Sequence, residues 1–312
     1  MLPWRVDKNH KHKLYYRLLS EFMLQQTQVK TVLPYFSKFL KHYPTLKSLS
    51  QAQERAILKL WEGLGYYRRA KNLLKSSKHL AKNKYKLPDS LDEIKKMPGI
   101  GTYTANALLA FIHDKPTLAV DGNVRRVFSR ILNTEETEIN FEKLIKLNKK
   151  KIFIKKRNSD VVEAFMEFGA IICKPKNPEC NSCKIKKKCN YFNSKKHKKV
   201  SLRKNIKSKK INVFCYLNKK RQIGLTKKSN VGFLKNFVLP EIKIRQKNLS
   251  KEWIFLLSYN QNISNKKFNI NLYYKFTKKI PGDFKWYNID NKNEMIPSFT
   301  KKILNKIEKI LL

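Results

Sequence analysis

The sequence predicts two regions of different fold class, a mostly α-helical N-terminal region followed by a small α+β domain. Between residues 14 and 172 apolar side chains recur at helical spacing, as in Leu18, Leu19 and Phe22, and strand-like alternation is scarce. After residue 210, short β-branched and aromatic runs alternate with turn residues. A hydrophobic fraction of 41% over 312 residues is enough to build two ordinary cores.

A basic segment separates the two regions. Residues 184–210 contain 13 lysine or arginine residues and no acidic residue, which is typical of a solvated linker. We therefore expect a first region over 1–190, a basic linker over 191–210 and a second domain over 211–312. In this second domain the runs at 211–217, 222–227, 253–259, 269–276 and 284–287 predict strands, and 299–312 predicts a closing helix.

The charge of the chain is strongly positive. It has 69 Lys and Arg against 23 Asp and Glu, a formal net charge of +46. Such an excess indicates a polyanionic partner such as nucleic acid, although an AT-rich genome would also enrich lysine. No run of 18 apolar residues occurs and the N-terminus turns polar after Trp4, so we expect a soluble, cytoplasmic protein with no membrane association.

Residues 97–104, Met-Pro-Gly-Ile-Gly-Thr-Tyr-Thr, lie between two helical patterns and predict a helix-hairpin-helix. Gly99 and Gly101 permit positive φ and a close approach of the backbone. Amides at the start of the second helix could then bind a DNA phosphate. An ordinary helix–helix turn has the same pattern, so the turn alone leaves both interpretations open.

Asp121 follows in the segment 118–126, where an apolar run meets a new helix. Asp is a common N-cap at such a position. The cap hydrogen bonds would also favour the ionised carboxylate beside a developing positive charge, so we interpret Asp121 as catalytic as well.

Four cysteines, Cys173, Cys180, Cys183 and Cys189, follow a Cys-x6-Cys-x2-Cys-x5-Cys spacing. Four thiolates this close in sequence can bind one metal centre. Zinc sites usually separate two Cys-x2-Cys pairs by roughly twelve or more residues, so the compact loop favours a 4Fe-4S cluster over zinc. Disulfides would leave Cys215 unpaired, and we expect a reducing compartment.

The hairpin, the Asp that follows it and the cysteine loop resemble the endonuclease III, or helix-hairpin-helix, superfamily of DNA glycosylases. Segments 2–5 (Leu-Pro-Trp-Arg), 20–29 (Ser-Glu-Phe-Met-Leu-Gln-Gln-Thr-Gln-Val) and 61–73 (Trp-Glu-Gly-Leu-Gly-Tyr-Tyr-Arg-Arg-Ala-Lys-Asn-Leu) are similar to the MutY-type adenine DNA glycosylases of that superfamily. The resemblance covers nearly the whole chain and is strongest over 2–190.

This resemblance implies a glycosylase catalytic region over 1–190, with the iron-sulfur loop at 173–189, and a Nudix-like lesion-recognition domain over 211–312. The implied reaction is the removal of adenine mispaired with 8-oxoguanine or guanine in double-stranded DNA, during base excision repair. A monomer is expected.

Hydrolysis of an N-glycosidic bond requires a protonated leaving group and a stabilised sugar cation, which two carboxyl groups in different environments can provide. By resemblance, Glu21 protonates adenine N7 and Asp121 stabilises the cation. Relatives that also cleave the backbone carry a lysine where this chain has Tyr103. A tyrosine cannot form the imine, which implies a monofunctional enzyme.

Further contacts with the flipped adenine and its partner are implied by the resemblance. Trp4 and Arg5 match a segment that lines the adenine pocket, and Glu163 matches a position that contacts the base. Gln26 and Tyr66 match residues that contact the mispair. The plainer interpretation of Gln26 and Glu163 is a helix-surface side chain, and that of Tyr66 is a core aromatic.

In the second domain, Ser264 matches a serine that contacts 8-oxoguanine, and Asn265 stands where the family has histidine. A plain turn serine fits the pattern equally well. The carboxylate-rich box of Nudix hydrolases is missing from the sequence, so this domain is expected to bind rather than to hydrolyse.

Three other functions stay open from the sequence. A pyrimidine-lesion glycosylase and lyase would need a lysine at position 103. A non-catalytic iron-sulfur DNA-binding protein would not need Glu21 or Asp121. A zinc-dependent regulator would be colourless, whereas a 4Fe-4S protein is yellow-brown.

Overall fold

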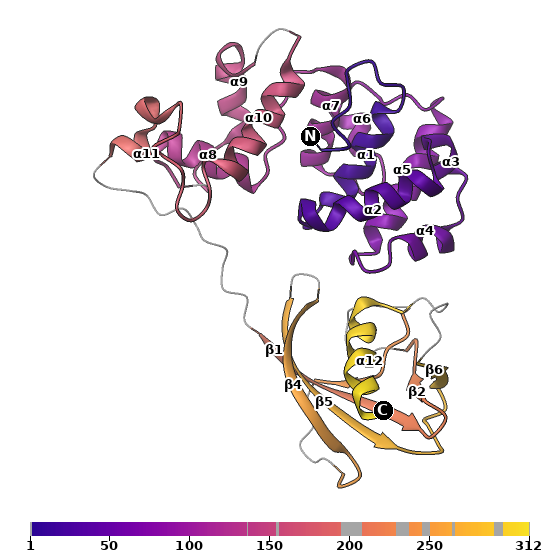
Figure 1. The fold of residues 1–312 in the computed structure, drawn as a ribbon. Helices are drawn as coiled ribbons and strands as arrows, with labels where there is room; N and C mark the ends of the chain where they lie inside the picture. Colours follow the sequence, from indigo (N-terminus) through magenta and orange to yellow (C-terminus); the bar gives the residue numbers. More distant parts are fainter. Residues whose placement is uncertain are drawn as a thin grey trace. The chain divides into compact units, whose positions relative to one another are not determined.

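The computed structural model describes residues 2–135, 137–153, 156–194, 208–228, 237–244, 250–263, 266–289 and 296–311. The chain divides into two compact units (Figure 1). The first contains Met1–Ile57 and Arg68–Lys204, and the second contains Leu58–Tyr67 and Asn205–Leu312.

The first unit is helical, which confirms the expected fold class of the N-terminal region. Its described helices, with α4 continuing into the second unit, are α1 (Lys13–Leu24), α2 (Val29–His42), α3 (Leu46–Ser50), α4 (Glu54–Leu60), α5 (Arg68–Lys82), α6 (Leu91–Lys95), α7 (Thr102–His113), α8 (Gly122–Leu132), α9 (Phe141–Ile152), α10 (Asn158–Ile171), η1 (Lys186–Lys188) and α11 (Asn190–Asn193).

Helix α1 is central to this unit because its apolar residues fall on one stripe. Leu18, Leu19, Phe22 and Met23 are each 0% exposed, and α1 packs against α2, α5 and α7. Burying four such side chains contributes roughly 1.5–3 kcal/mol each before the entropy cost of folding. This packing fixes the end of α1 at which Glu21 lies.

A second cluster of buried side chains joins α7, α8 and α10, with Ala107, Val124, Phe128 and Val162 among its members. Phe128 stacks on Phe165 of α10, with ring centroids 5.0 Å apart. The three helices therefore pack as one unit, which supports Asp121 at the start of α8.

The second unit is a mixed β-sheet with one described helix. Its elements are β1 (Lys209–Asn218), β2 (Gln222–Leu225), β3 (Glu241–Lys243), β4 (Ile254–Ile263), β5 (Lys266–Phe276), β6 (Lys285–Asn288) and α12 (Ser298–Leu311). The strand order is β4-β5-β1-β2-β6, with β3 paired to β1. Strands β1 and β5 are parallel and the other described pairs are antiparallel.

Alternation along β1 builds the core of this sheet. Val213 and Cys215 are 0% exposed and lie in one cluster with Phe299 and Ile303 of α12, which covers one face of the sheet (Figure 1). The expected combination of strands and a closing helix is confirmed, and β3 is a short addition. Ser264 and Asn265 lie outside the described residues.

None of the described helices combines the length and the apolar content that a membrane crossing requires.

Candidate active site

Glu21 is a buried acid near the end of α1, with 6% of its surface exposed. Burial disfavours the charged carboxylate and raises the pKa of Glu21 to about 7. The negative charges of Asp121 and Glu163 act in the same direction, whereas Arg17 and a hydrogen bond from Tyr103 lower this pKa. A carboxyl group of this kind holds a proton near neutral pH and can donate it.

Tyr103, the second residue of α7, lies directly at this acid. Its hydroxyl donates a hydrogen bond to the carboxylate of Glu21. Burial, and then the charges of Glu21 and Asp121, raise the pKa of Tyr103 above its ordinary value, so the hydroxyl stays protonated. The side chain carries no amine and cannot form an imine with a sugar aldehyde.

Asp121 is the N-cap of α8, as the sequence predicts. One carboxylate oxygen accepts a hydrogen bond from the backbone N–H of Val124 at 2.7 Å, and the other accepts one from Nδ2 of Asn123 at 2.9 Å. Both oxygens are therefore fixed in direction, and the helix N-terminus favours a negative charge at this place.

The hairpin joins α6 to α7, with Gly101 as the N-cap of α7. Gly99 has φ +79, and a Cβ there would lie 2.5 Å from Nδ2 of Asn72, so the close approach expected at Gly99 is present. Gly101 differs from the expectation of positive φ, because its φ is −93, a value open to any residue. It is exposed, and open space surrounds the position of a Cβ, which leaves the amides at the start of α7 accessible.

Glu163 on α10 is surrounded by cationic side chains. Nη2 of Arg17 lies 2.5 Å from one oxygen, an ionic contact without hydrogen-bond alignment, and Nε of Arg5 lies 3.5 Å from the other. Arg5 also forms an ion pair with Glu167. Glu21, Asp121, Tyr103, Glu163 and Arg5 thus belong to one polar group of side chains.

Arg17 was not singled out by the sequence analysis. The available signal is its position four residues before Glu21, on the same face of a helix. Trp4 is 3% exposed and packs edge-on against Phe36, with ring centroids 5.2 Å apart, so in this structure it is a core side chain.

Gln26 and Tyr66 both have left-handed backbone conformations, which are uncommon outside glycine and occur often at functional turns. Gln26 has φ 57 and is exposed just after α1. Tyr66 has φ 49 and is half-buried, and Gly65 before it has φ 74. Arg69 supports the turn at Gln26, because its guanidinium donates to the carbonyls of Met23 at 2.7 Å and Gln25 at 2.6 Å.

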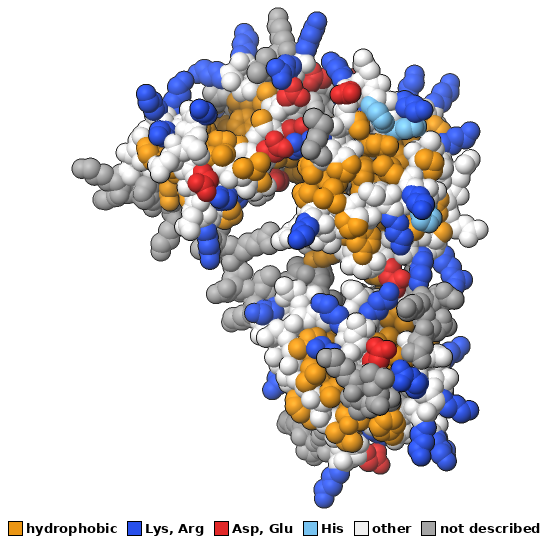
Figure 2. Space-filling model, viewed as in Figure 1, with side chains coloured by type: hydrophobic (Ala, Val, Ile, Leu, Met, Phe, Trp, Pro, Cys, Tyr) orange, Lys and Arg blue, Asp and Glu red, His pale blue; other side chains and the backbone are white. Residues whose placement is uncertain are grey.

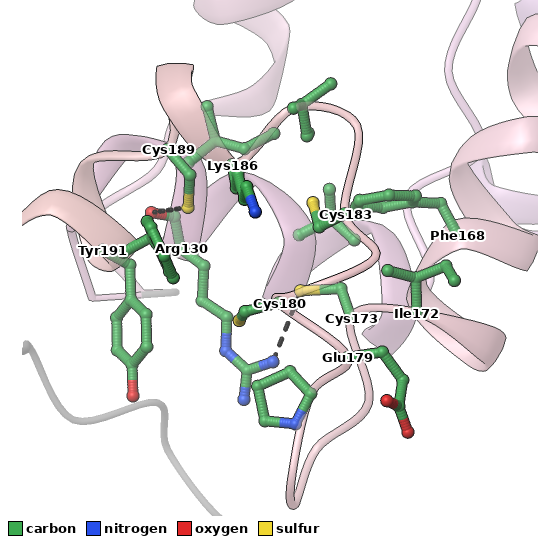
Figure 3. A pocket seen from close by; sticks show the side chains of 15 residues that line it. Arg130, Phe168, Ile172, Cys173, Glu179, Cys180, Cys183, Lys186, Cys189 and Tyr191 are labelled. Carbon is green, nitrogen blue, oxygen red and sulfur yellow. Dashed lines mark hydrogen bonds between the residues drawn. The ribbon is translucent and has the colours of Figure 1, made fainter.

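The four cysteine thiols of the loop that follows α10 line one cavity (Figure 3). All are free thiols. Burial raises the pKa of Cys180, and the three neighbouring thiols add to the effect, so the sulfur atoms lie close enough to interact. Among the described residues, no group of three or more His, Cys, Asp or Glu side chains is arranged to hold a single metal ion.

Helix α8 connects this loop to Asp121. Arg126 donates from Nε to the carbonyl of Cys173 at 2.8 Å and from Nη2 to Oδ1 of Asn123 at 2.8 Å. Arg130 donates to the carbonyl of Lys174 at 2.7 Å. It also donates to the Cys173 sulfur at 3.3 Å (Figure 3). One helix therefore carries the capped carboxylate at its start and anchors the cysteine loop further along.

Comparisons with known proteins agree with this arrangement. Residues 19–151 match the HhH-GPD superfamily base excision DNA repair proteins. An adenine DNA glycosylase of Buchnera aphidicola subsp. Baizongia pistaciae is 35% identical over 99% of this chain and 92% of that protein. One from Buchnera aphidicola subsp. Acyrthosiphon pisum is 33% identical over 99% of this chain and 93% of that protein.

Among solved structures, a thermostable thymine-DNA glycosylase is similar in fold. The TM-score is 0.54 at 25% identity, covering 62% of this chain and 88% of the other. Two relatives above 30% identity over nearly the full length decide the family, and the chain belongs to the adenine DNA glycosylases of the HhH-GPD superfamily.

Proposed function

We propose that this adenine DNA glycosylase of base excision repair is monofunctional and acts on adenine opposite 8-oxoguanine or guanine in double-stranded DNA. The full-length relatives give the adenine DNA glycosylase activity. The observation that carries the mechanism is the pairing of a buried Glu21, whose pKa is raised to about 7, with a hydrogen-bonded Asp121.

Glu21 supplies the proton for the leaving group. Its protonated carboxyl donates to N7 of the flipped adenine, so the electrons of the C1′–N9 bond pass to the base as that bond breaks. The carboxylate of Asp121 then faces a sugar with cationic character and stabilises it. Water adds to C1′ and gives a proton to the Glu21 carboxylate left by the first step, which leaves an abasic site and free adenine.

Tyr103 supports the monofunctional assignment. Its hydroxyl holds Glu21 by a hydrogen bond, and the position lacks the amine needed for strand cleavage through an imine. The DNA strand therefore stays intact after the base has left.

We infer that Cys173, Cys180, Cys183 and Cys189 hold a 4Fe-4S cluster. The donor set consists of thiols alone, and the sulfurs line a cavity. A single zinc ion needs its four ligands at about 2.0–2.3 Å from one point, whereas a cubane spreads its four cysteines around a larger body, which suits this arrangement better. A bound cluster would supply a cross-link that holds the loop on α8 and α10.

DNA contact is supported by charge and by the hairpin. The net charge is +46, and Figure 2 shows Lys and Arg side chains over the visible face of the described residues, with acidic side chains few among them. Gly101 leaves the start of α7 open to a phosphate. We propose that Gln26 and Tyr66 contact the mispair. We also propose that the second unit is a Nudix-like domain that recognises the lesion, with Ser264 as one of its contacts.

A single-turnover assay tests this function. Duplexes that contain A opposite 8-oxoguanine, A opposite G, or thymine glycol are incubated with wild type and Glu21→Gln, and each is analysed with and without alkali. We expect cleavage only at the adenine strand and only after alkali, with loss of the activity in Glu21→Gln. Glu142→Gln, at an exposed position on α9, is the matched control and should keep full activity. Nicking at thymine glycol without alkali would overturn the assignment.

A further inference from the structure

Arg17 is a buried charge on α1, one helical turn before Glu21. Only 5% of its surface is exposed, and its guanidinium carbon lies 4.4 Å from the centre of the Phe111 ring. A charge removed from water is costly unless it is paired, so its partners indicate what it does.

The ionic partner of Arg17 is Glu163 on α10, with Nη2 2.5 Å from Oε1. The second oxygen of Glu163 lies 3.5 Å from Nε of Arg5. The Glu163 side chain is 17% exposed, so solvent screens the pair only in part. Glu163 is therefore held between guanidinium groups from α1 and from the N-terminal segment.

Arg17 also lies beside the general acid. Residues four apart on a helix share a face, with Cβ atoms about 5–6 Å apart, and both Arg17 and Glu21 are on the buried side of α1. The other polar groups that act on Glu21 are Tyr103 of α7, Asp121 at the start of α8 and Glu163 of α10. Glu21 therefore lies near one cation, Arg17, and two other carboxylates, Asp121 and Glu163.

Packing alone does not account for an arginine here. Its Nε is buried and has no hydrogen-bond partner among the described residues, and an unpaired buried donor weakens a fold. Buried ion pairs can often be replaced by apolar side chains without loss of stability. Arg17 lies near Glu21 and Glu163, two carboxyl groups of the proposed active site, and this position indicates a functional role.

We propose that Arg17 is a positioning residue of the active site, which holds Glu163 in place and supplies positive charge beside the carboxyl groups of Glu21 and Glu163. The inference rests on the proposed function, because it concerns how Glu21 acts as an acid. The pKa of Glu21 then reflects two opposing effects, burial that raises it and Arg17 that lowers it. Without Arg17, Glu21 stays protonated to higher pH, and Glu163 loses a partner.

The test compares Arg17→Met, Arg17→Lys and the matched control Arg157→Met, which removes an exposed arginine paired with Asp160 on α10. The Glu21 carboxyl is titrated by ¹³C NMR in the free protein, with Glu21→Gln to assign the signal. The single-turnover rate of adenine release from an A:8-oxoguanine duplex is measured over the same pH range.

Arg17→Met should move the Glu21 titration and the alkaline limb of the rate upward by about one to two pH units, because unit charges about 6 Å apart interact appreciably at an effective dielectric constant of about 20. Arg17→Lys should keep the titration near that of wild type but slow release by about tenfold, because an ammonium group lacks the planar fork that holds Glu163.

A titration and a rate profile of Arg17→Met that coincide with those of Arg157→Met would overturn the proposal. If circular dichroism shows that Arg17→Met does not fold, Arg17→Lys decides, and an unchanged rate in that variant contradicts the positioning role. A wild-type protein that releases no adenine would count against the proposed function only, since the NMR titration still tests the charge effect of Arg17.

Discussion

Replacing Glu21 with glutamine should stabilise the fold while it abolishes adenine release. The folded protein holds the pKa of Glu21 at about 7, against 4.5 for an ordinary glutamate, a difference of 7 − 4.5 = 2.5. At about 1.4 kcal/mol for each pH unit, the ionised carboxylate weakens the folded state by about 3 kcal/mol above neutral pH. Glutamine has nearly the same shape and still accepts the hydrogen bond of Tyr103, but it carries no charge.

The sign of the pH dependence follows from the raised pKa. Between pH 4.5 and 7 the folded protein keeps a proton that the unfolded chain has released, so wild-type stability falls as pH rises through this window. Glu21→Gln lacks this ionisation, and its advantage should grow from nearly zero at about pH 4.5 to about 3 kcal/mol above pH 7.

Urea unfolding of both proteins, followed by circular dichroism at about pH 5 and about pH 8, measures this advantage. Both proteins share the cysteine loop, so its contribution cancels in the difference, and Glu142→Gln controls for a general loss of negative charge. An advantage of equal size at the two pH values would refute the reasoning, because it would mean that Glu21 ionises in the folded protein as it does in the unfolded chain.

The other predictions concern the hairpin, the cysteine loop and the charge. Tyr103→Phe removes the hydrogen bond that lowers the pKa of Glu21, so the alkaline limb of single-turnover activity should move to higher pH, and an identical profile would contradict this role. Cys183→Ser should lose the absorbance near ~400 nm of a 4Fe-4S cluster, whereas Cys215→Ala, in the sheet core, should keep it. Gly99→Ala should destabilise the hairpin by more than about 1 kcal/mol in urea unfolding, because of φ +79 and the contact with Asn72, while Gly101→Ala meets open space and should cost less. Observed DNA affinity should fall with log salt at a slope of about 0.9 for each phosphate contacted, and salt-insensitive binding would exclude the electrostatic contribution.

The sequence predicts those features of the site that depend on local chemistry. The cap at Asp121 follows from a carboxylate before a helix, and the tight turn at Gly99 follows from a glycine, which adopts φ +79 without strain. The helical region and the strands of the second domain are predicted by the spacing of apolar residues, whereas the mixed parallel and antiparallel pairing of these strands is not. The three-residue strand β3 is too short to produce such a pattern.

Features that depend on tertiary packing could not be predicted in this way. Arg17 has the pattern of a solvated helix residue, and only the packing of α7 against α1 and the ionic contact with Glu163 of α10 show that it is buried and ion-paired. Trp4 likewise becomes a core side chain through its contact with Phe36 of α2. The backbone at Gly101 takes an ordinary φ because a helix N-cap needs an extended conformation, which the glycine itself does not indicate.

The two acids at the centre of this site differ in burial and in the kind of helix end at which they lie, since Glu21 is buried and Asp121 is half-buried. Burial is the main reason that the pKa of Glu21 is raised, and Glu21 also lies in the last turn of α1, where carbonyl groups do not favour a negative charge. Asp121 stands at the start of α8, where N–H groups point at its carboxylate. Burial therefore favours a proton on Glu21, whereas two hydrogen bonds fix the direction of the Asp121 carboxylate. This difference results from the burial of one acid and the capping position of the other, and the arginines of α8 that bind the cysteine loop join α8, which Asp121 caps, to that loop.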